Sequence, residues 1–265
     1  MPTHSQALIQ SLIHAPLLVT DLPEARSFDR HSLQLPSPPP DLDPHQKLGH
    51  LYEAALTAVL EASPAHELLA RSLQLHDPDQ KTRGELDFLL RDLTSGRLIH
   101  LELATKFYLA LESPDGLLLP GPDARDNYFR KIHRLRTHQL TLTKRYTHLL
   151  PQSYRGEPVT PEQLIYGCIF DHVQAGNPAT ADFIAPTCRR GRWLKLEEVN
   201  AHFPPGTKLE HIPKTLWPVP LEFLENFPLE PWQPPATIDR CTMLRVENSP
   251  LPHFVTPSGY PVHKA

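Results

Sequence analysis

The spacing of apolar residues predicts two helices near the start of the chain. Over 5–14 and again over 45–62, apolar side chains recur three and four positions apart, as on one face of a helix. The second run ends at Ser63 and Pro64. Between the two runs, the proline-rich segment 33–44 is typical of an extended connector, which separates an N-terminal arm from the main body.

Three strand-like runs follow the second helix, over 66–75, 85–92 and 97–111. The last two are joined by the turn 93–96, which is too short for a crossover between parallel strands. The three runs therefore predict an antiparallel meander.

A long helix is expected next, over 124–150, and then a buried strand over 163–173 with β-branched and aromatic residues. Three further strand-like runs, over 190–199, 214–223 and 242–246, lie among prolines that do not suit central strands. We therefore expect an α/β protein in three parts. These are an N-terminal arm and connector (1–44), a core of helix, meander, helix and strand (45–173), and a C-terminal extension of unassigned role, rich in proline and short strands (174–265).

Composition changes this picture little, although it excludes some classes of protein. The 265 residues include 31 prolines and carry a net charge of −4, which excludes a uniformly basic nucleic-acid binder. Cys168, Cys188 and Cys241 are too few and too widely spaced for a disulfide framework or a zinc site, so we expect reduced, buried thiols. With no secretory signal and no apolar run long enough to span a bilayer, a cytoplasmic protein without membrane contact is expected.

Two of the predicted strands carry acidic residues among apolar neighbours. Residues two apart on a strand share a face, so Asp87 joins Glu85, and Glu102 joins His100 and Lys106. Carboxylates gathered on a half-buried face repel one another unless a cation compensates, and a divalent metal ion would do so. The plainer alternative is a surface hairpin whose acids face solvent.

Three motifs in this region resemble those of the PD-(D/E)XK nuclease superfamily, whose fold is that of the restriction endonucleases. GELDFLLRD and LIHLELATKF are similar to the second and third core strands of that superfamily, and LGHLYEA is similar to its first-helix signature, in which a glycine precedes a glutamate by four residues. The resemblance covers 45–173. More narrowly, the chain looks like a bacterial family labelled only as a domain of unknown function and assigned to this superfamily.

This resemblance implies hydrolysis of phosphodiester bonds with Mg²⁺ or Mn²⁺ as cofactor. Asp87 and Glu102 would be metal ligands, Leu103 would offer its carbonyl oxygen, and Glu53 would be the helix acid that supports a water on the metal. As an alternative, the chain is a catalytically inactive member that keeps the fold as a nucleic-acid-binding or protein-binding module.

One position departs from the pattern of the superfamily, because Ala104 stands where its catalytic lysine is expected. Lys106 lies two residues further along the same face, and four strand residues separate it from Glu102 by about 13 Å. Either a β-bulge shortens this distance, or the amine comes from elsewhere, or the site no longer catalyses. Lys131 on the following helix is the candidate replacement, with Gln139 as a further polar group facing the site.

The same helix is strongly basic, although the chain as a whole is acidic. Its arginines suit the docking of backbone phosphates, with DNA favoured over RNA, whereas a plain solvated face is the alternative reading. The sequence leaves open whether the chain forms a homodimer. The predicted nucleic-acid-binding residues are Arg125, Arg130, Arg134 and Arg136.

Overall fold

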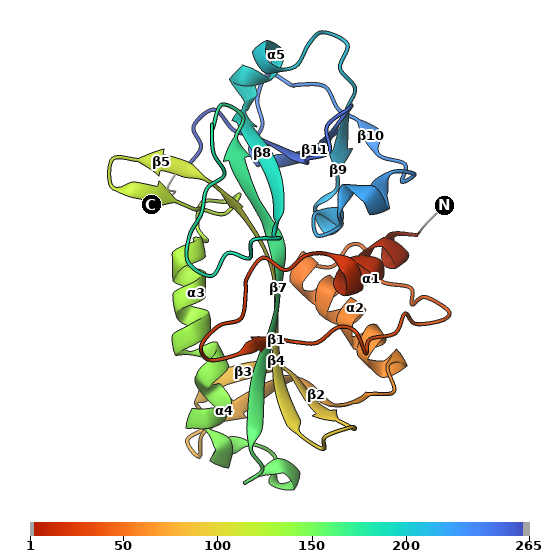
Figure 1. Cartoon of the computed structure of the whole chain (residues 1–265), viewed down its shortest axis with the longest axis vertical. Coiled ribbons are helices and arrows are strands. Elements are labelled where there is room, and N and C mark those ends of the chain that lie inside the picture. The colour runs from red at the N-terminus through yellow and green to blue at the C-terminus, as the bar shows by residue number, and fades with distance from the viewer. Residues whose placement is uncertain (1–2, 262–265) are drawn as a thin grey trace.

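The computed structural model describes residues 3–261, which form a mixed α/β fold around one ten-stranded sheet (Figure 1). The strands lie in the order β10 (Glu230–Pro231), β9 (Leu209–Ile212), β11 (Thr242–Val246), β12 (His253–Thr256), β8 (Arg189–Lys195), β7 (Val159–His172), β4 (Leu98–Leu109), β3 (Thr82–Asp92) and β2 (His66–His76), with β1 (Arg26–Ser27) beside β7.

Antiparallel and parallel pairs are combined in this sheet. β2, β3 and β4 form the antiparallel meander that the sequence predicts. β4, β7, β8 and β12 then run parallel to one another in the middle of the sheet. β11 and β9 continue from β12 in antiparallel order, and β10 closes that edge.

Helices cover both faces of the central strands (Figure 1). α1 (His4–His14) and α2 (Leu48–Ala62), the two helices that the apolar spacing predicts, lie on one side and pack against each other. α3 (Tyr128–Thr137) and α4 (Leu142–Arg145) lie on the other side. The short α5 (Val199–His202) follows β8 near one end of the molecule.

The prediction of one continuous helix over 124–150 is wrong. α3 begins only at Tyr128, where the Asn127 side chain caps it, and ends at Thr137. Short 3₁₀ turns and α4 replace the rest. The hydroxyl of Thr141 donates to backbone carbonyls at Thr137 and His138, and such local bonds compete with a regular helix.

Other boundaries also differ from the sequence pattern. β7 begins four residues before the predicted 163, and a small hairpin of β5 (Leu111–Ser113) and β6 (Gly116–Leu118) follows β4. The expected strand at 214–223 is wrong, because this segment forms two 3₁₀ turns, each preceded by a proline. Proline lacks the N–H that a strand partner would need.

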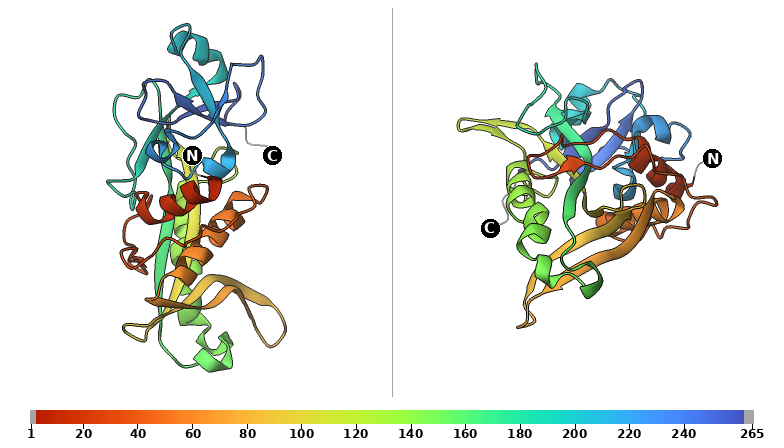
Figure 2. Two further views of the ribbon diagram at one scale, coloured as in Figure 1. Left: turned by 90° about the vertical axis from the view of Figure 1, so that its right-hand side faces the viewer. Right: turned by 60° about the horizontal axis from the view of Figure 1, so that its bottom comes forward.

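The hydrophobic core draws on all three predicted parts of the chain. One cluster joins Leu8 of α1, Leu56 of α2, Phe88 of β3 and Phe254 of β12, and a second lies between the sheet and α3. Figure 2 shows the N-terminal segment crossing the middle of the molecule, where β1 pairs with β7.

Two tryptophans link neighbouring segments of the fold through their indole N–H groups. The Trp193 indole donates to the carbonyl of Ala110, and that of Trp217 to the carbonyl of Ile212. All three cysteines are free and buried, as expected. Among the described residues, no helix has the length and apolar character needed to cross a bilayer.

Candidate functional site

Asp87 and Glu102 face each other where the β3–β4 pair opens. The ladder between these strands ends with Phe88 opposite Leu101, so the next position places Asp87 opposite Glu102. Beyond this point Asp87 Oδ2 accepts a hydrogen bond of 2.9 Å from the Leu103 backbone N–H. A side chain thus replaces the backbone ladder, and the two carboxylates lie on one side of the sheet.

The electrostatic environment of Asp87 is unfavourable for its charged form. Burial first, and then the charges of Glu102 and Glu53, raise the pKa of Asp87 to about 8, whereas the Leu103 N–H and the Lys131 amine act in the opposite direction. Glu53 is half-buried on α2 and lies 3.7 Å from His50. The three predicted acids are therefore close enough to interact.

Glu102 is 1% exposed and held on both sides by hydrogen bonds. Its Oε1 lies 2.9 Å from Nε2 of His100, and because a carboxylate oxygen only accepts, the ring nitrogen donates. Its Oε2 accepts a bond of 2.6 Å from Nε2 of Gln139, whose Oε1 in turn accepts one of 2.9 Å from Nζ of Lys131. These bonds fix the orientation of Glu102.

Lys131 reaches this centre and Lys106 does not. The pKa of Lys131 is lowered, chiefly by burial and also by the charge of Lys106, although Glu102 and Asp87 oppose this. The β4–β7 ladder has no register shift, so no bulge brings Lys106 towards Glu102. The Lys106 amine instead pairs with Asp126 at 2.7 Å.

The four predicted arginines differ in their availability. Arg130 and Arg134 are exposed on α3, where Arg130 also donates to the carbonyl of Arg125, and Arg125 is exposed but paired with Asp123. Arg136 is held within the fold, because its Nε and Nη2 each donate to Glu24 at 2.9 Å and its guanidinium lies over the ring of Phe183. It joins α3 to the N-terminal segment.

Sequence reasoning gave no role to His100 or Asp126. His100 is fully buried, and its Nδ1 has no partner among the described residues. Its position two residues before Glu102, on the same face of the strand, was the available signal. Nothing local in the sequence indicates that Asp126 pairs with Lys106, because the two lie on different elements.

The donor set suits a hard divalent cation held by few protein groups. Asp87 and Glu102 are two neighbouring carboxylates, and Mg²⁺ binds through one or two carboxylates while it keeps several waters. Each Glu102 oxygen accepts one hydrogen bond and retains a second lone pair. No cluster of three or more His, Cys, Asp or Glu side chains suited to a metal occurs within 3–261, so a backbone carbonyl such as that of Leu103 would have to contribute.

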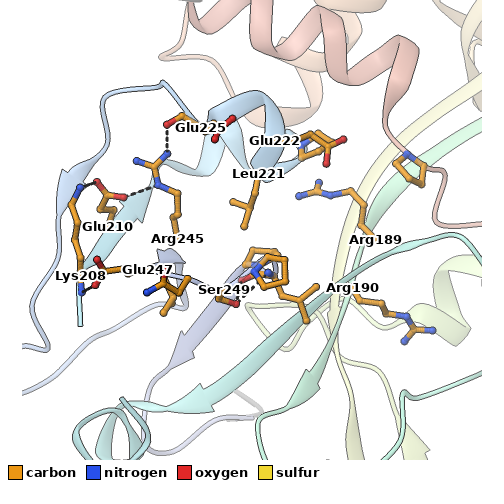
Figure 3. A pocket seen from close by; sticks show the side chains of 17 residues that line it. Arg189, Arg190, Lys208, Glu210, Leu221, Glu222, Glu225, Arg245, Glu247 and Ser249 are labelled. Atoms are coloured by element: carbon orange, nitrogen blue, oxygen red, sulfur yellow. Dashed lines mark hydrogen bonds and ion pairs between the residues drawn. The ribbon is translucent and has the colours of Figure 1, made fainter. Parts of the chain in front are cut away.

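A cavity of about 770 Å³ lies elsewhere, between the first loop and the C-terminal strands (Figure 3). Three of its charged residues bind one another: Arg245 pairs with Glu210 at 2.6 Å, and Lys208 pairs with the same carboxylate at 2.8 Å. Arg189 donates to three backbone carbonyls at Trp217 and the two residues that follow. This cavity contains none of the predicted site residues, and its ion pairs connect β9, β11 and their loops.

Comparison with known proteins yields one family. The family model described as Domain of unknown function (DUF1853) matches residues 5–252. No curated protein and no solved structure matches the chain.

Proposed function

The chain belongs to the DUF1853 family, and we propose that it is a metal-dependent nuclease of the PD-(D/E)XK type, which hydrolyses phosphodiester bonds at Asp87 and Glu102. The observation that carries this proposal is the placement of the two carboxylates, opposite each other at the opening of β3 and β4, with the amine of Lys131 close by. The family description assigns no function, so the proposal is based on the site itself.

Each residue has a part that follows from its geometry. Asp87, Glu102 and the Leu103 carbonyl would hold Mg²⁺ or Mn²⁺, and such an ion supplies Lewis-acid chemistry at a phosphoryl group. Ala104 stands where the superfamily has its catalytic lysine. The Lys131 amine would take over that role and stabilise negative charge on the scissile phosphate. Gln139 positions both the Lys131 amine and Glu102, because it bonds to each. Glu53 adds a third acid beside Asp87.

The substrate class follows from charge. Arg130 and Arg134 expose two guanidinium groups on α3, the helix that also carries Lys131. Because phosphate contacts position a nucleic acid without reading its sequence, these arginines would dock the backbone while the scissile phosphate meets the carboxylates. DNA is the favoured substrate.

Incubation of the purified chain with plasmid, linear and branched DNA, in Mg²⁺ or Mn²⁺, tests the proposal. We expect nicking or degradation that is absent from the Asp87→Asn variant. Glu85→Gln is a matched control, because Glu85 lies on the same strand but its exposed side chain accepts a hydrogen bond from Gln74, outside the candidate site. Equal activity in the wild-type and Asp87→Asn proteins would refute the enzyme assignment.

A catalytically inactive nucleic-acid-binding module is the second candidate. It is favoured by Ala104 at the lysine position and by the bonds from His100 and Gln139, each of which already uses one lone pair of a Glu102 oxygen. This alternative predicts binding of DNA without metal and no hydrolysis under any metal, so the same assay, with a binding measurement added, separates the two candidates.

A further inference from the structure

α3 presents a second feature, on the side opposite to Lys131. A pocket of about 290 Å³ lies there, near the lower limit of the roughly 300–1,000 Å³ of small-ligand sites. Its volume suits one planar ring system better than a large ligand. The residues that line it are Glu24, Tyr128, Phe129, Ile132, His133, Arg136, Thr137, Asp182 and Phe183.

Three aromatic side chains, Tyr128, Phe129 and Phe183, form part of the walls of this pocket. Phe129 is 44% exposed, so its ring is accessible to a ligand. Phe183 approaches from the loop before β8 and holds a backbone φ of 65°, which is rare for a bulky residue. The hydroxyl of Tyr128 donates to the carbonyl of Asp182, and this bond ties the loop to the helix.

The acids at the pocket do not oppose an anionic ligand strongly. Glu24 is neutralised by Arg136, at 2.9 Å. Asp182 is exposed at the rim, and His133 is exposed beside it on the helix. The pocket therefore combines aromatic rings with an internally neutralised ion pair, and the exposed arginines that come next on α3, Arg130 and Arg134, are positive.

The order of residues around α3 connects this pocket to the candidate site. An α-helix turns by about 100° per residue, so Phe129 and His133 share one side, Arg130 and Arg134 come next, and Lys131 lies about 200° from Phe129. The two exposed arginines thus lie between the pocket and the carboxylates. A helix with its side chains is about 10–12 Å across, a distance that a few nucleotides can span.

We propose that the pocket between Phe129 and Phe183 binds an unpaired nucleobase of a single-stranded nucleic acid, whose backbone crosses Arg130 and Arg134 towards Asp87 and Glu102. Bases stack on aromatic rings whatever their identity, and cationic side chains hold the phosphates of the same strand. A base inside a duplex is not free to enter such a slot. The inference rests on the proposed function only for the path of the nucleic acid towards Asp87 and Glu102. It goes further because it states that the bound segment is single-stranded and not duplex.

Binding is measured without hydrolysis, on the full chain in a chelator, with fluorescein-labelled single strands and the matching duplex. We expect single strands to bind more tightly than the duplex, and Phe129→Ala to weaken single-strand binding roughly tenfold or more with duplex binding unchanged. Phe129→Tyr should restore the affinity. A fluorescent purine analogue in the strand should lose emission on binding to the wild-type protein and not on binding to Phe129→Ala.

Leu93→Ala is the control for loss of an exposed apolar side chain, because Leu93 is 55% exposed in the β3–β4 turn. Strands of DNA and of RNA are compared: a Phe129-dependent affinity for either one supports the pocket and identifies which backbone it accepts. If Phe129→Ala binds both as tightly as Leu93→Ala does, or if the duplex binds as well as the single strand, the pocket proposal is overturned.

The outcome is separable from that of the proposed function. Phe129-dependent binding without any Asp87-dependent hydrolysis would retain the pocket and refute the nuclease. Asp87-dependent hydrolysis with binding that ignores Phe129 would retain the nuclease and refute the pocket.

Discussion

Single side chains define the candidate site through a continuous series of hydrogen bonds. The series runs from His100 through Glu102 and Gln139 to Lys131. Each bond joins groups that are buried or half-buried, where polar contacts are strong and unpaired groups are costly. The amine and the carboxylate are therefore held at fixed positions before any substrate binds.

The two lysines should differ in their effect on catalysis. We expect Lys131→Met to lower the rate of phosphodiester cleavage on the order of 100-fold, because its amine is the cation beside Glu102 and Asp87. Lys106→Met should leave the rate unchanged, because that amine is paired with Asp126. Single-turnover cleavage of a labelled DNA measures both variants, and the reverse order would assign the amine to Lys106.

Asp87 should reduce the stability of the metal-free protein. Burial and the charge of Glu102 both disfavour its carboxylate, so Asp87→Asn should raise the free energy of unfolding at pH 8 by about 2 kcal/mol. Mn²⁺ should raise the melting temperature of the wild-type protein and not that of the variant. A variant that is less stable than the wild-type protein without metal would show that Asp87 has a structural role instead.

The sequence predicted which acids lie together, and the reason is local. Strand alternation and the short turn 93–96 fix the faces and nearly fix the register, so Asp87 and Glu102 could be paired in advance. The placement of Lys131 and Gln139 was also predicted, but only through the resemblance. Asp126 could not be anticipated, because its contact with Lys106 depends on how the loop before α3 returns to the sheet.

At the scale of elements, the close approach of β4 and β7 depends on a glycine. Gly167 lies opposite Lys106 with a φ of 153°, and a Cβ there would come within 1.7 Å of the Lys106 carbonyl oxygen. No side chain other than hydrogen fits that space. The glycine keeps β7 against the strand that carries Glu102.

Two glycine substitutions should therefore have opposite effects on stability. Gly167→Ala should lower the free energy of unfolding by about 3 kcal/mol or more, because backbone must move. Gly49→Ala in α2 should raise it by about 0.5–1 kcal/mol, because nothing lies within 4 Å and alanine favours a helix. Urea titrations measure both, and a stable Gly167→Ala protein would contradict the packing of β4 on β7.

β12 contains a histidine whose burial links stability to pH. Burial first, and then the nearby charges of His202 and Arg192, lower the pKa of His253 to about 4, while its bond to the Leu251 carbonyl has the opposite effect. The unfolded chain, with a histidine pKa of about 6.5, binds this proton more readily than the folded one. The stability that depends on a neutral His253 is therefore fully present above pH 6.5 and is lost as the pH falls towards 4.

Between pH 7 and pH 5, this residue should remove about 2 kcal/mol of stability. The His253→Asn variant should lose correspondingly less over the same interval, measured by urea titration at each pH. An identical pH dependence in the two proteins would show that His253 is accessible to protons in the fold.

The prediction of element boundaries failed where tertiary contacts decide them. The segment 214–223 has strand-like composition, yet its prolines and the Arg189 guanidinium, which binds three successive carbonyls from Trp217 onwards, hold it in 3₁₀ turns. A charged group from a distant strand leaves no local pattern in the segment it binds.

Across the whole molecule, the N-terminal segment contributes to the same core as the meander and the C-terminal strands. β1 pairs with β7, and Leu8 and Phe28 lie in the cluster that contains Phe254. Long-range pairings of this kind carry no signal in local hydrophobic spacing, which is why the sequence presents the arm as separate. In Figure 1, β3, the strand of Asp87, lies towards the opposite end of the molecule from β9 and β11, whose residues line the charged cavity of Figure 3.

Calorimetric titration of the metal-free chain with Mn²⁺ tests most directly whether Asp87 and Glu102 share a divalent ion. One binding event per chain is expected in the wild-type protein and in Glu85→Gln, and none in Asp87→Asn or Glu102→Gln. An unchanged heat of Mn²⁺ binding in Asp87→Asn, or no binding of Mn²⁺ to the wild-type protein, would contradict the shared site.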